Sequence, residues 1–480
     1  MKSVLKTLRR LAVVPCGRLV LAGGLLGGVC DAPAVGASDF AFVTTTDYTT
    51  GSSSVIRPGA TYTVEKNVAA VHSDAVARYY NGRVFVVNRE GADNIQILDP
   101  ANGFSTVRQF TVGTSSNPHD IAVVGTTKAY VTRYDETALW IVDPSTGAHT
   151  GSIDLSALAD ADGIPEMDQM AVLGDRLFVT IQRIDQTTWG PSGTSYVAVI
   201  DIATDTLIDA DPAAPGVQPI LLTGTNPVSD IQLNPCTGKL HVPCEGFLGL
   251  LDGGVEIIDP IALESEDFLF TEVAAGGDIG DVEIICEEKG YAIITNASFN
   301  NVLIAFDPST GTRTGTLYAP GDFVLNDIEI SPERRLFLTD RTPTRPGIRV
   351  YDTYTDEELT SPPLDVGLPP FDICFSSAIQ TGVRDNTPVP AALGENYPNP
   401  FNPETTIPFS VARAGRTTIS IYDPAGRRVR LLIDQYYASG AHVVGWDGRD
   451  DAGGRVASGV YFVKLETGGY TVARKLVVLK

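Results

Sequence analysis

One short acidic segment has the residue types of a calcium loop. Residues 157–168 read ALADADGIPEMD and place Asp160, Asp162 and Glu166 around Gly163. Closely spaced carboxylates supply the oxygen ligands that Ca²⁺ prefers, and glycine permits the sharp turn of such a loop. The segment therefore predicts a calcium site with Asp160, Asp162 and Glu166 as its ligands. The alternative, which a single incomplete loop favours, is an acidic connection whose carboxylates face water.

A second set of carboxylates recurs along the chain at intervals of 45 to 62 residues. Each aspartate directly precedes an alternating apolar segment. The seven are Asp74, Asp120, Asp168, Asp230, Asp281, Asp327 and Asp372. If they gather in a ring, they would hold a cation or repel anions. The structural alternative, which we favour, is that each side chain accepts backbone N–H bonds within its own turn, as in an Asx turn.

Residues for nucleophilic or acid–base catalysis are scarce. The chain has five histidines and no GxSxG, HExxH or P-loop motif. We therefore predict that the protein is not an enzyme, and we assign no catalytic residue.

The elements that position these residues form a repeat of about fifty residues. Its second strand reads RVFVVN at 83–88, KAYVTR at 128–133 and RLFVTI at 176–181, and its third ends near an Asp-Pro turn. Alternation of Val, Ile, Phe and Tyr, interrupted by Gly, Pro, Asp and Asn, indicates short strands and tight turns. Units of this length with four strands are typical of propeller blades. The sequence predicts an all-β fold with a seven-bladed β-propeller over residues 38–380.

The two ends of this region complement each other. The unit that begins at Asp372 lacks its outer strands, whereas residues 38–65 read as outer strands without an inner one. Pairing them would close the ring and remove two exposed sheet edges. We therefore predict one blade shared by the two ends.

The phrase NPHDIAVVGTTKAYVTRYDETALWIVDPSTG at 117–147 resembles the YVTN-type propeller repeats of secreted and periplasmic proteins. The resemblance implies the fold and leaves the function open, because propellers host binding, scaffolding and catalysis. Lactonase-type and lyase-type propellers use His, Asn and carboxylates around a divalent metal. His72, His119 and Asn326 are the residues that would serve this alternative.

The last ninety residues form a different module. After a linker at 381–390, alternating segments at 405–411, 416–422, 428–433, 441–446, 459–466 and 470–479 predict a small β-sandwich over 391–480. Its expected core aromatics are Tyr422, Trp446, Tyr461 and Phe462.

The phrases NYPNPFNP, ISIYDPAGRRVR and GWDGRDDAGGRVASGVYFVKL in this module resemble the Ig-like C-terminal domain of type IX secretion cargo. They are also similar to the Ig-like domain of flagellar hook-capping proteins. The first resemblance implies export across an outer membrane, with the secretion machinery as the partner of residues 391–480. The alternative is a purely structural Ig-like domain.

The N-terminus has the pattern of a secretory signal peptide over residues 1–37. A basic start, a short apolar run and Val35-Gly36-Ala37 predict cleavage before Ser38. No later segment approaches the roughly eighteen consecutive apolar residues that a transmembrane helix needs. The mature chain keeps Cys236, Cys244, Cys286 and Cys374, which allow either disulfides in three pairings or four buried thiols.

Charge divides the chain in the same way. Residues 38–390 carry 19 basic and 49 acidic residues, whereas residues 391–480 carry 11 and 8. An acidic body argues against nucleic acid as a partner. We predict a secreted or cell-surface propeller that passes through the periplasm and binds an unidentified protein or glycan.

Overall fold

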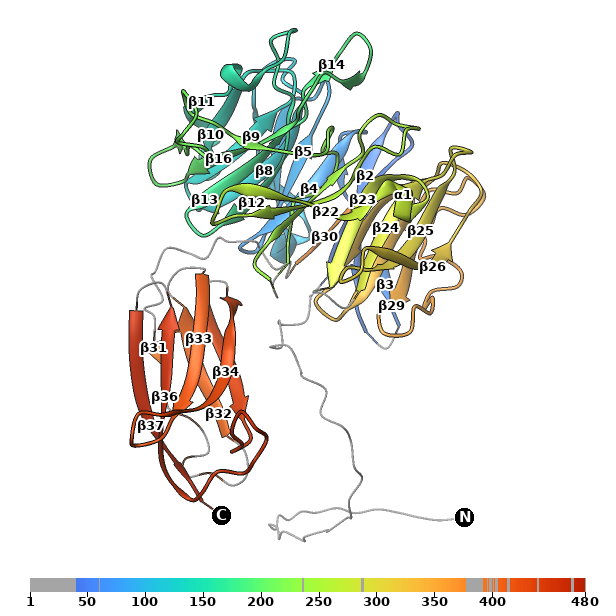
Figure 1. Cartoon of the computed structure of the whole chain (residues 1–480). Helices are drawn as coiled ribbons and strands as arrows, with labels where there is room; N and C mark the ends of the chain where they lie inside the picture. The colour runs from blue at the N-terminus through green and yellow to red at the C-terminus, as the bar shows by residue number, and fades with distance from the viewer. Residues whose placement is uncertain are drawn as a thin grey trace, which may run out of the picture. The chain divides into compact units, whose positions relative to one another are not determined.

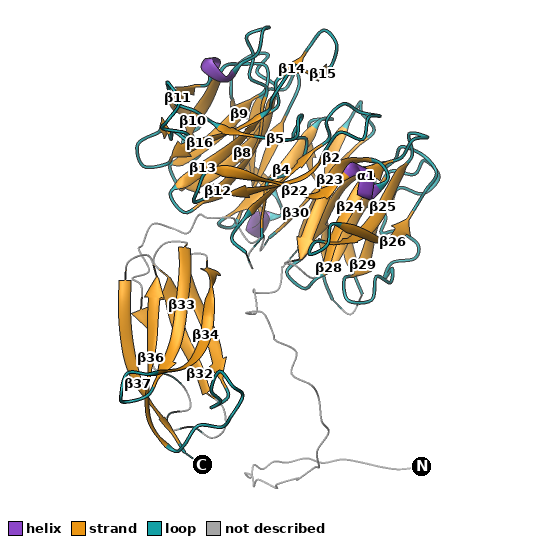
Figure 2. Cartoon of the chain, viewed as in Figure 1, coloured by secondary structure: helices purple, strands orange, loops and turns teal. Residues whose placement is uncertain are grey.

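The computed structural model describes residues 40–376 and most of 392–479, with gaps at 60, 235–236 and 286–288 and several short ones after 394. The predicted signal peptide and the linker at 381–390 lie outside the described residues. Within them, helix is confined to α1 (Glu272–Ala275), η1 (Pro100–Asn102) and η2 (Ser156–Leu158), and strands make up the rest of the regular structure (Figures 1 and 2). No helix among these residues has the length and apolarity that crossing a membrane requires.

Residues 40–376 form a β-propeller whose blades are antiparallel sheets. Five of these sheets have four strands, and in four of the five the strands follow one another along the chain. The first two contain β4 (Ala75–Tyr80), β5 (Arg83–Asn88), β6 (Asn94–Asp99) and β7 (Ser105–Thr111), and then β8 (Pro118–Gly125), β9 (Lys128–Arg133), β10 (Ala138–Asp143) and β11 (Ala148–Asp154). The other two contain β19 (Gln232–Leu233), β20 (Leu240–Cys244), β21 (Gly254–Asp259) and β22 (Glu264–Thr271), and then β23 (Asp278–Ile285), β24 (Lys289–Thr295), β25 (Asn301–Asp307) and β26 (Thr312–Tyr318). Each third strand ends at its Asp because the turn begins there.

Two further sheets depart slightly from this pattern. One contains β12 (Met167–Leu173), β13 (Arg176–Ile181) and β16 (Tyr196–Asp201), with β17 (Thr206–Leu207) and β18 (Ile220–Leu221) both beside β16. The other contains β27 (Leu325–Ile330), β28 (Arg335–Asp340) and β29 (Gly347–Asp352). A small hairpin, β14 (Ile184–Asp185) and β15 (Gly190–Pro191), lies between β13 and β16 and accounts for part of the 62-residue interval.

The last blade joins the two ends of the propeller. Its strand order is β3 (Thr63–Val71), β2 (Gly51–Arg57), β1 (Ala41–Thr46) and β30 (Pro370–Phe375). β1 pairs antiparallel with β30, with Ala41 opposite Phe375 and Val43 opposite Ile373. The first strands of the propeller therefore complete its final sheet, as the sequence predicts.

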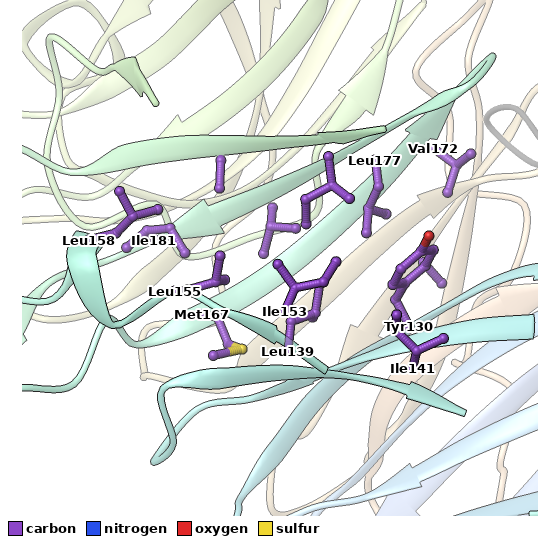
Figure 3. Packing of buried hydrophobic residues seen from close by; sticks show 14 residues of the cluster. Tyr130, Leu139, Ile141, Ile153, Leu155, Leu158, Met167, Val172, Leu177 and Ile181 are labelled. Atoms are coloured by element: carbon purple, nitrogen blue, oxygen red, sulfur yellow. The ribbon is translucent and has the colours of Figure 1, made fainter. Parts of the chain in front are cut away.

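Both faces of each central strand are buried between neighbouring blades. Tyr130 of β9 packs in a cluster with Leu177 and Ile181 of the next blade (Figure 3), whereas Ala129 and Val131 pack against the preceding one. Because alternate residues point to opposite faces of a strand, a strand buried on both faces becomes almost continuously apolar. This burial explains the sequence of the KAYVTR-type strands.

The C-terminal module is a two-sheet sandwich with its own core. One sheet has the order β31 (Ala392–Leu393), β32 (Thr405–Val411) and β35 (Gly440–Trp446). The other has the order β34 (Arg428–Tyr437), β33 (Gly415–Tyr422), β36 (Gly459–Thr467) and β37 (Tyr470–Val478). The core contains Trp446 and Tyr461 as predicted.

Two of the predicted core aromatics of this module are not buried. Phe462 is 37 % exposed and Tyr422 is half-buried. In β36, Tyr461, Val463 and Leu465 face the core. Phe462 lies between them in sequence and points to the other face of the sheet, because side chains alternate along a strand.

Candidate functional site

The inner strands of all the blades begin at one face of the propeller. In an antiparallel meander, the connection from the fourth strand to the next blade lies at the same end as the connection from the second strand to the third. We call this end the entry face. It contains the predicted aspartates, His72 and His119, and the acidic loop at 157–168.

Aspartates at the starts of the inner strands join neighbouring blades through the backbone. Each accepts an N–H bond from the next inner strand: Asp120 from Met170 at 2.9 Å, Asp281 from Ile328, Asp327 from Ile373 and Asp372 from Ala77, each at 2.8 Å. These four aspartates therefore accept backbone N–H bonds as predicted, but the bonds run between blades and not within the turn of each aspartate. The donor belongs to the next blade, so the bond fixes the spacing of the blades.

Two of the seven predicted ring members have other roles. In two other blades, an aspartate (Asp327 or Asp372) directly precedes the residue whose N–H donates to the neighbouring blade. In β4 and β12 this position holds Val76 and Gln169 instead. Asp74 instead accepts bonds from Arg89, at 2.9 Å from Nε. Asp168 accepts a bond from the His119 ring, at 2.8 Å. The ring of carboxylates therefore has two gaps, because spacing in the sequence did not determine the register.

The Arg78 guanidinium lies among three of the other carboxylates. Arg78 of β4 donates from Nε to Asp120 at 2.9 Å and from Nη2 to Asp230 at 2.8 Å, and its Nη1 lies 3.6 Å from Asp372. Its Nη2 also donates to Gln169 at 2.9 Å. Arg78 belongs to no sequence motif. An alignment of the repeats would have marked it, because the residues at the same position of other blades are Ala171, Glu329 and Cys374, and none of them is basic.

The surrounding acids titrate unusually. Burial raises the pKa of Asp120 to about 6, although Arg78 opposes the shift, and it raises the pKa of Asp281 and Asp372 to about 7. Burial and then the neighbouring carboxylates raise the pKa of Glu283 and that of Glu329 well above the ordinary value. Near neutral pH, part of this cluster therefore retains protons.

A histidine–aspartate pair lies beside this cluster at the entry face. The Asp168 carboxylate, which is 3 % exposed, contacts Nδ1 of His119 and also accepts a bond from Gln182 at 2.8 Å. The Tyr134 ring stacks on His119 at 4.2 Å, and its hydroxyl donates to Gln182 at 2.7 Å. The network fixes the orientation of the imidazole and its tautomer at Nδ1.

The other predicted metal-site residues are already hydrogen-bonded. Asn326 donates to the Phe371 carbonyl at 2.7 Å, and His72 contacts the Asp74 backbone through Nδ1. Among the residues that the structure describes, no three His, Cys, Asp or Glu side chains form a group that could hold a metal ion.

The acidic loop has a turn geometry of its own. Asp160 accepts the Asp162 N–H at 3.0 Å and a bond from Ser192, and Asp162 accepts the Ile164 N–H at 2.9 Å. Glu166 is fully buried and accepts the Ile184 N–H at 3.1 Å. Burial raises the pKa of Glu166 to about 8. Calcium binding by these three residues stays a prediction.

Two of the four cysteines that follow the predicted signal peptide lie in the described part of the chain. Cys244 and Cys374 are buried free thiols, and burial raises the pKa of each well above its ordinary value. Cys236 and Cys286 lie outside the described residues.

Several solved structures resemble the chain at low identity. A protein from Lactobacillus plantarum has a TM-score of 0.50 and 13 % identity, over 70 % of this chain and 99 % of that one. PorZ, a surface component of the type IX secretion system of Porphyromonas gingivalis, has a TM-score of 0.41 and 15 % identity over 89 % of this chain. The alignment spans 63 % of PorZ. A streptogramin B lyase has a TM-score of 0.43 and 11 % identity, over 64 % and 92 % of the two chains.

The structural likeness to the Lactobacillus plantarum protein shows the fold alone. The search of curated proteins finds no match. Among protein families, the FlgD Ig-like domain matches residues 404–469, which include most of the C-terminal sandwich.

Proposed function

We propose that this protein is a secreted or cell-surface binding protein, in which a C-terminal Ig-like sorting domain exports a seven-bladed propeller. The observation that carries the proposal is the C-terminal module itself. It matches the FlgD Ig-like family over residues 404–469, and its core cluster consists only of its own residues, from Leu393 to Val478. A module with its own core can serve as a signal independent of its cargo.

The polar residues at the inner strands of the propeller leave its loops as the part that can bind a ligand. Arg78 and four of the aspartates hold the blades together, so their hydrogen-bonding capacity serves the scaffold. The loops of the entry face are then the part that can vary without loss of the fold. The ligand on the cell surface would be a protein or a glycan.

A metal-dependent lactonase or lyase is the second candidate. The oriented His119–Asp168 pair is the observation that favours it, because a fixed imidazole can serve as a general base. Hydrolysis of lactone substrates by the metal-supplemented protein, lost in His119→Ala, would support this candidate.

Truncation tests the proposed export route. In a host with a type IX system, the chain that ends before Ala473 lacks most of β37 and should stay in the periplasm with a folded propeller, while the full chain reaches the medium or cell surface. Equal export of both chains would overturn the proposal. The matched control replaces exposed Arg455 by Ala, which leaves every strand of the module intact.

A further inference from the structure

The loops of the entry face expose large apolar side chains. Trp189 lies in the connection between β13 and β16, and Phe299 lies between β24 and β25. The connection between β20 and β21 contributes four residues in one short loop. Together these residues form a group that we call the apolar patch: Trp189, Phe247, Leu248, Leu250, Leu251 and Phe299, each between 43 and 72 % exposed. Exposed apolar side chains gathered in this way mark interaction sites.

The patch is continuous across three blades. The Phe247 ring lies directly against Gly190 of the β14–β15 hairpin, where a Cβ atom would come within 2.6 Å of the ring. On its other side, the Phe299 ring reaches Gly249, at 3.8 Å from the position of a Cβ atom. Glycine at 190 therefore lets the hairpin approach the Phe247 ring, whereas the Phe299 ring and residue 249 meet at an ordinary van der Waals distance.

The central loop at 245–253 has a fixed backbone. Leu250 donates to the Phe247 carbonyl at 2.8 Å, and the Phe247 N–H donates to Asp252 at 3.0 Å. The Gly249 N–H donates to Asp278 at 2.8 Å, and that carboxylate is 3 % exposed. A loop held in this way loses little conformational entropy when it binds a partner.

The loops that carry the patch contain more acidic than basic residues. The three loops at 182–195, 245–253 and 296–300 contain Asp185, Glu245 and Asp252 and one cation, Arg183. The Arg183 guanidinium lies over the Tyr196 ring at 4.7 Å and donates to the Thr194 carbonyl at 2.7 Å. Burial raises the pKa of Glu245 to about 7, so Asp185 and Asp252 are the carboxylates that suit these loops to cations of a partner.

We propose that the apolar patch binds a segment of a partner protein in which aliphatic or aromatic side chains are flanked by Lys or Arg. The apolar side chains of the segment would cover Phe247, Leu250 and their neighbours, and its cations would face the carboxylates of these loops. The proposal deepens the proposed function, on which it rests, by giving the chemical class of the partner.

Charge and side-chain type exclude the other occupants as first choices. A second copy would bring its own carboxylates against these, since residues 38–390 carry 49 acidic and 19 basic residues. An anionic lipid surface meets the same repulsion. A glycan needs polar partners as well as aromatic rings, whereas the centre of the patch is leucine and phenylalanine.

The test uses purified chain that begins at Ser38 and a phage-displayed library of random twelve-residue peptides. We expect selection of peptides that combine apolar residues with Lys or Arg. In the double variant Phe247→Ser/Leu250→Ser, the Kd of a selected synthetic peptide should rise about tenfold or more. The matched control, Val107→Ser/Ile261→Ser, changes residues that are 48 and 62 % exposed elsewhere on the propeller and should leave the Kd unchanged.

Unchanged urea unfolding midpoints would establish that both variants fold. Failure to select peptides, selection of acidic ones, or equal binding by the patch variant would overturn the proposal. The proposal would also be overturned if the protein formed a dimer, or bound a glycan on an array, and the patch substitutions abolished that dimer or that binding. Peptide binding is measured on purified protein and does not depend on export. A failed binding assay would therefore not contradict the proposed sorting route, and failed export would not contradict the proposed role of the apolar patch.

Discussion

Replacement of Arg78 by Met should destabilise the propeller strongly, and more so at high pH. Met keeps the length of the side chain and removes the charge that contacts Asp120, Asp230 and Asp372. Loss of one partner from a buried ion pair costs about 3–5 kcal/mol of unfolding free energy. We expect a loss of this size near pH 8, where the remaining carboxylates are most charged.

The loss should shrink on acidification. Burial raises the folded-state pKa of Asp120 to about 6 and that of Asp372 to about 7. A carboxyl with a raised pKa contributes most stability below its unfolded pKa and loses it as the pH rises through the folded value. Without Arg78 these pKa values rise further, so protonation near pH 5 relieves the unpaired charges and the loss falls to about 1–2 kcal/mol.

Urea unfolding of the two proteins at both pH values measures this difference. The control is Arg83→Met, whose guanidinium is 41 % exposed and contacts Asp99 at 2.9 Å. That surface pair should contribute at most about 1 kcal/mol at either pH. Equal losses from Arg78→Met at the two pH values, or a loss no greater than that of the control, would refute the role assigned to Arg78.

Four further outcomes follow. The wild-type chain should lose stability between about pH 6.5 and pH 8, because burial raises the pKa of Glu272 to about 7 and that of Glu166 to about 8; rising urea midpoints would contradict this sign. Deletion of residues 38–65 should expose the edge of β30 and cause aggregation, and a soluble monomer would count against the shared blade. EDTA should leave the melting temperature unchanged if the loop at 157–168 is the acidic connection that its incomplete motif favours; a calcium-dependent rise that Asp162→Asn removes would instead support the calcium site. Mass spectrometry of exported protein should find Ser38 as the first residue, and an intact Met1 form would contradict cleavage.

The strands were predictable because turn residues and alternation are local signals. KAYVTR and RLFVTI coincide with β9 and β13, and Asp143-Pro144 closes β10 as expected. The shared blade was also predictable, because the repeat at each end of the propeller is incomplete and the strands missing from one end are present at the other.

The candidate site was less accessible to sequence reasoning. Asp74 and Asp168 have the spacing of the ring, yet the register places Val76 and Gln169 there. Asp168 lies one residue before Gln169, and a one-residue shift moves a side chain to the other face of a strand. Asp74 lies two residues before Val76 and precedes the start of β4, and spacing alone fixes neither displacement. Arg78 gave no motif, because its role depends on three carboxylates from three other blades.

Fusion of residues 391–480 to an unrelated exported reporter would show whether this module directs export. In a bacterium with a type IX secretion system, we expect the fused reporter to reach the medium or the outer cell surface, while the reporter alone stays in the periplasm. A reporter that folds, carries the module and remains in the periplasm would contradict this expectation.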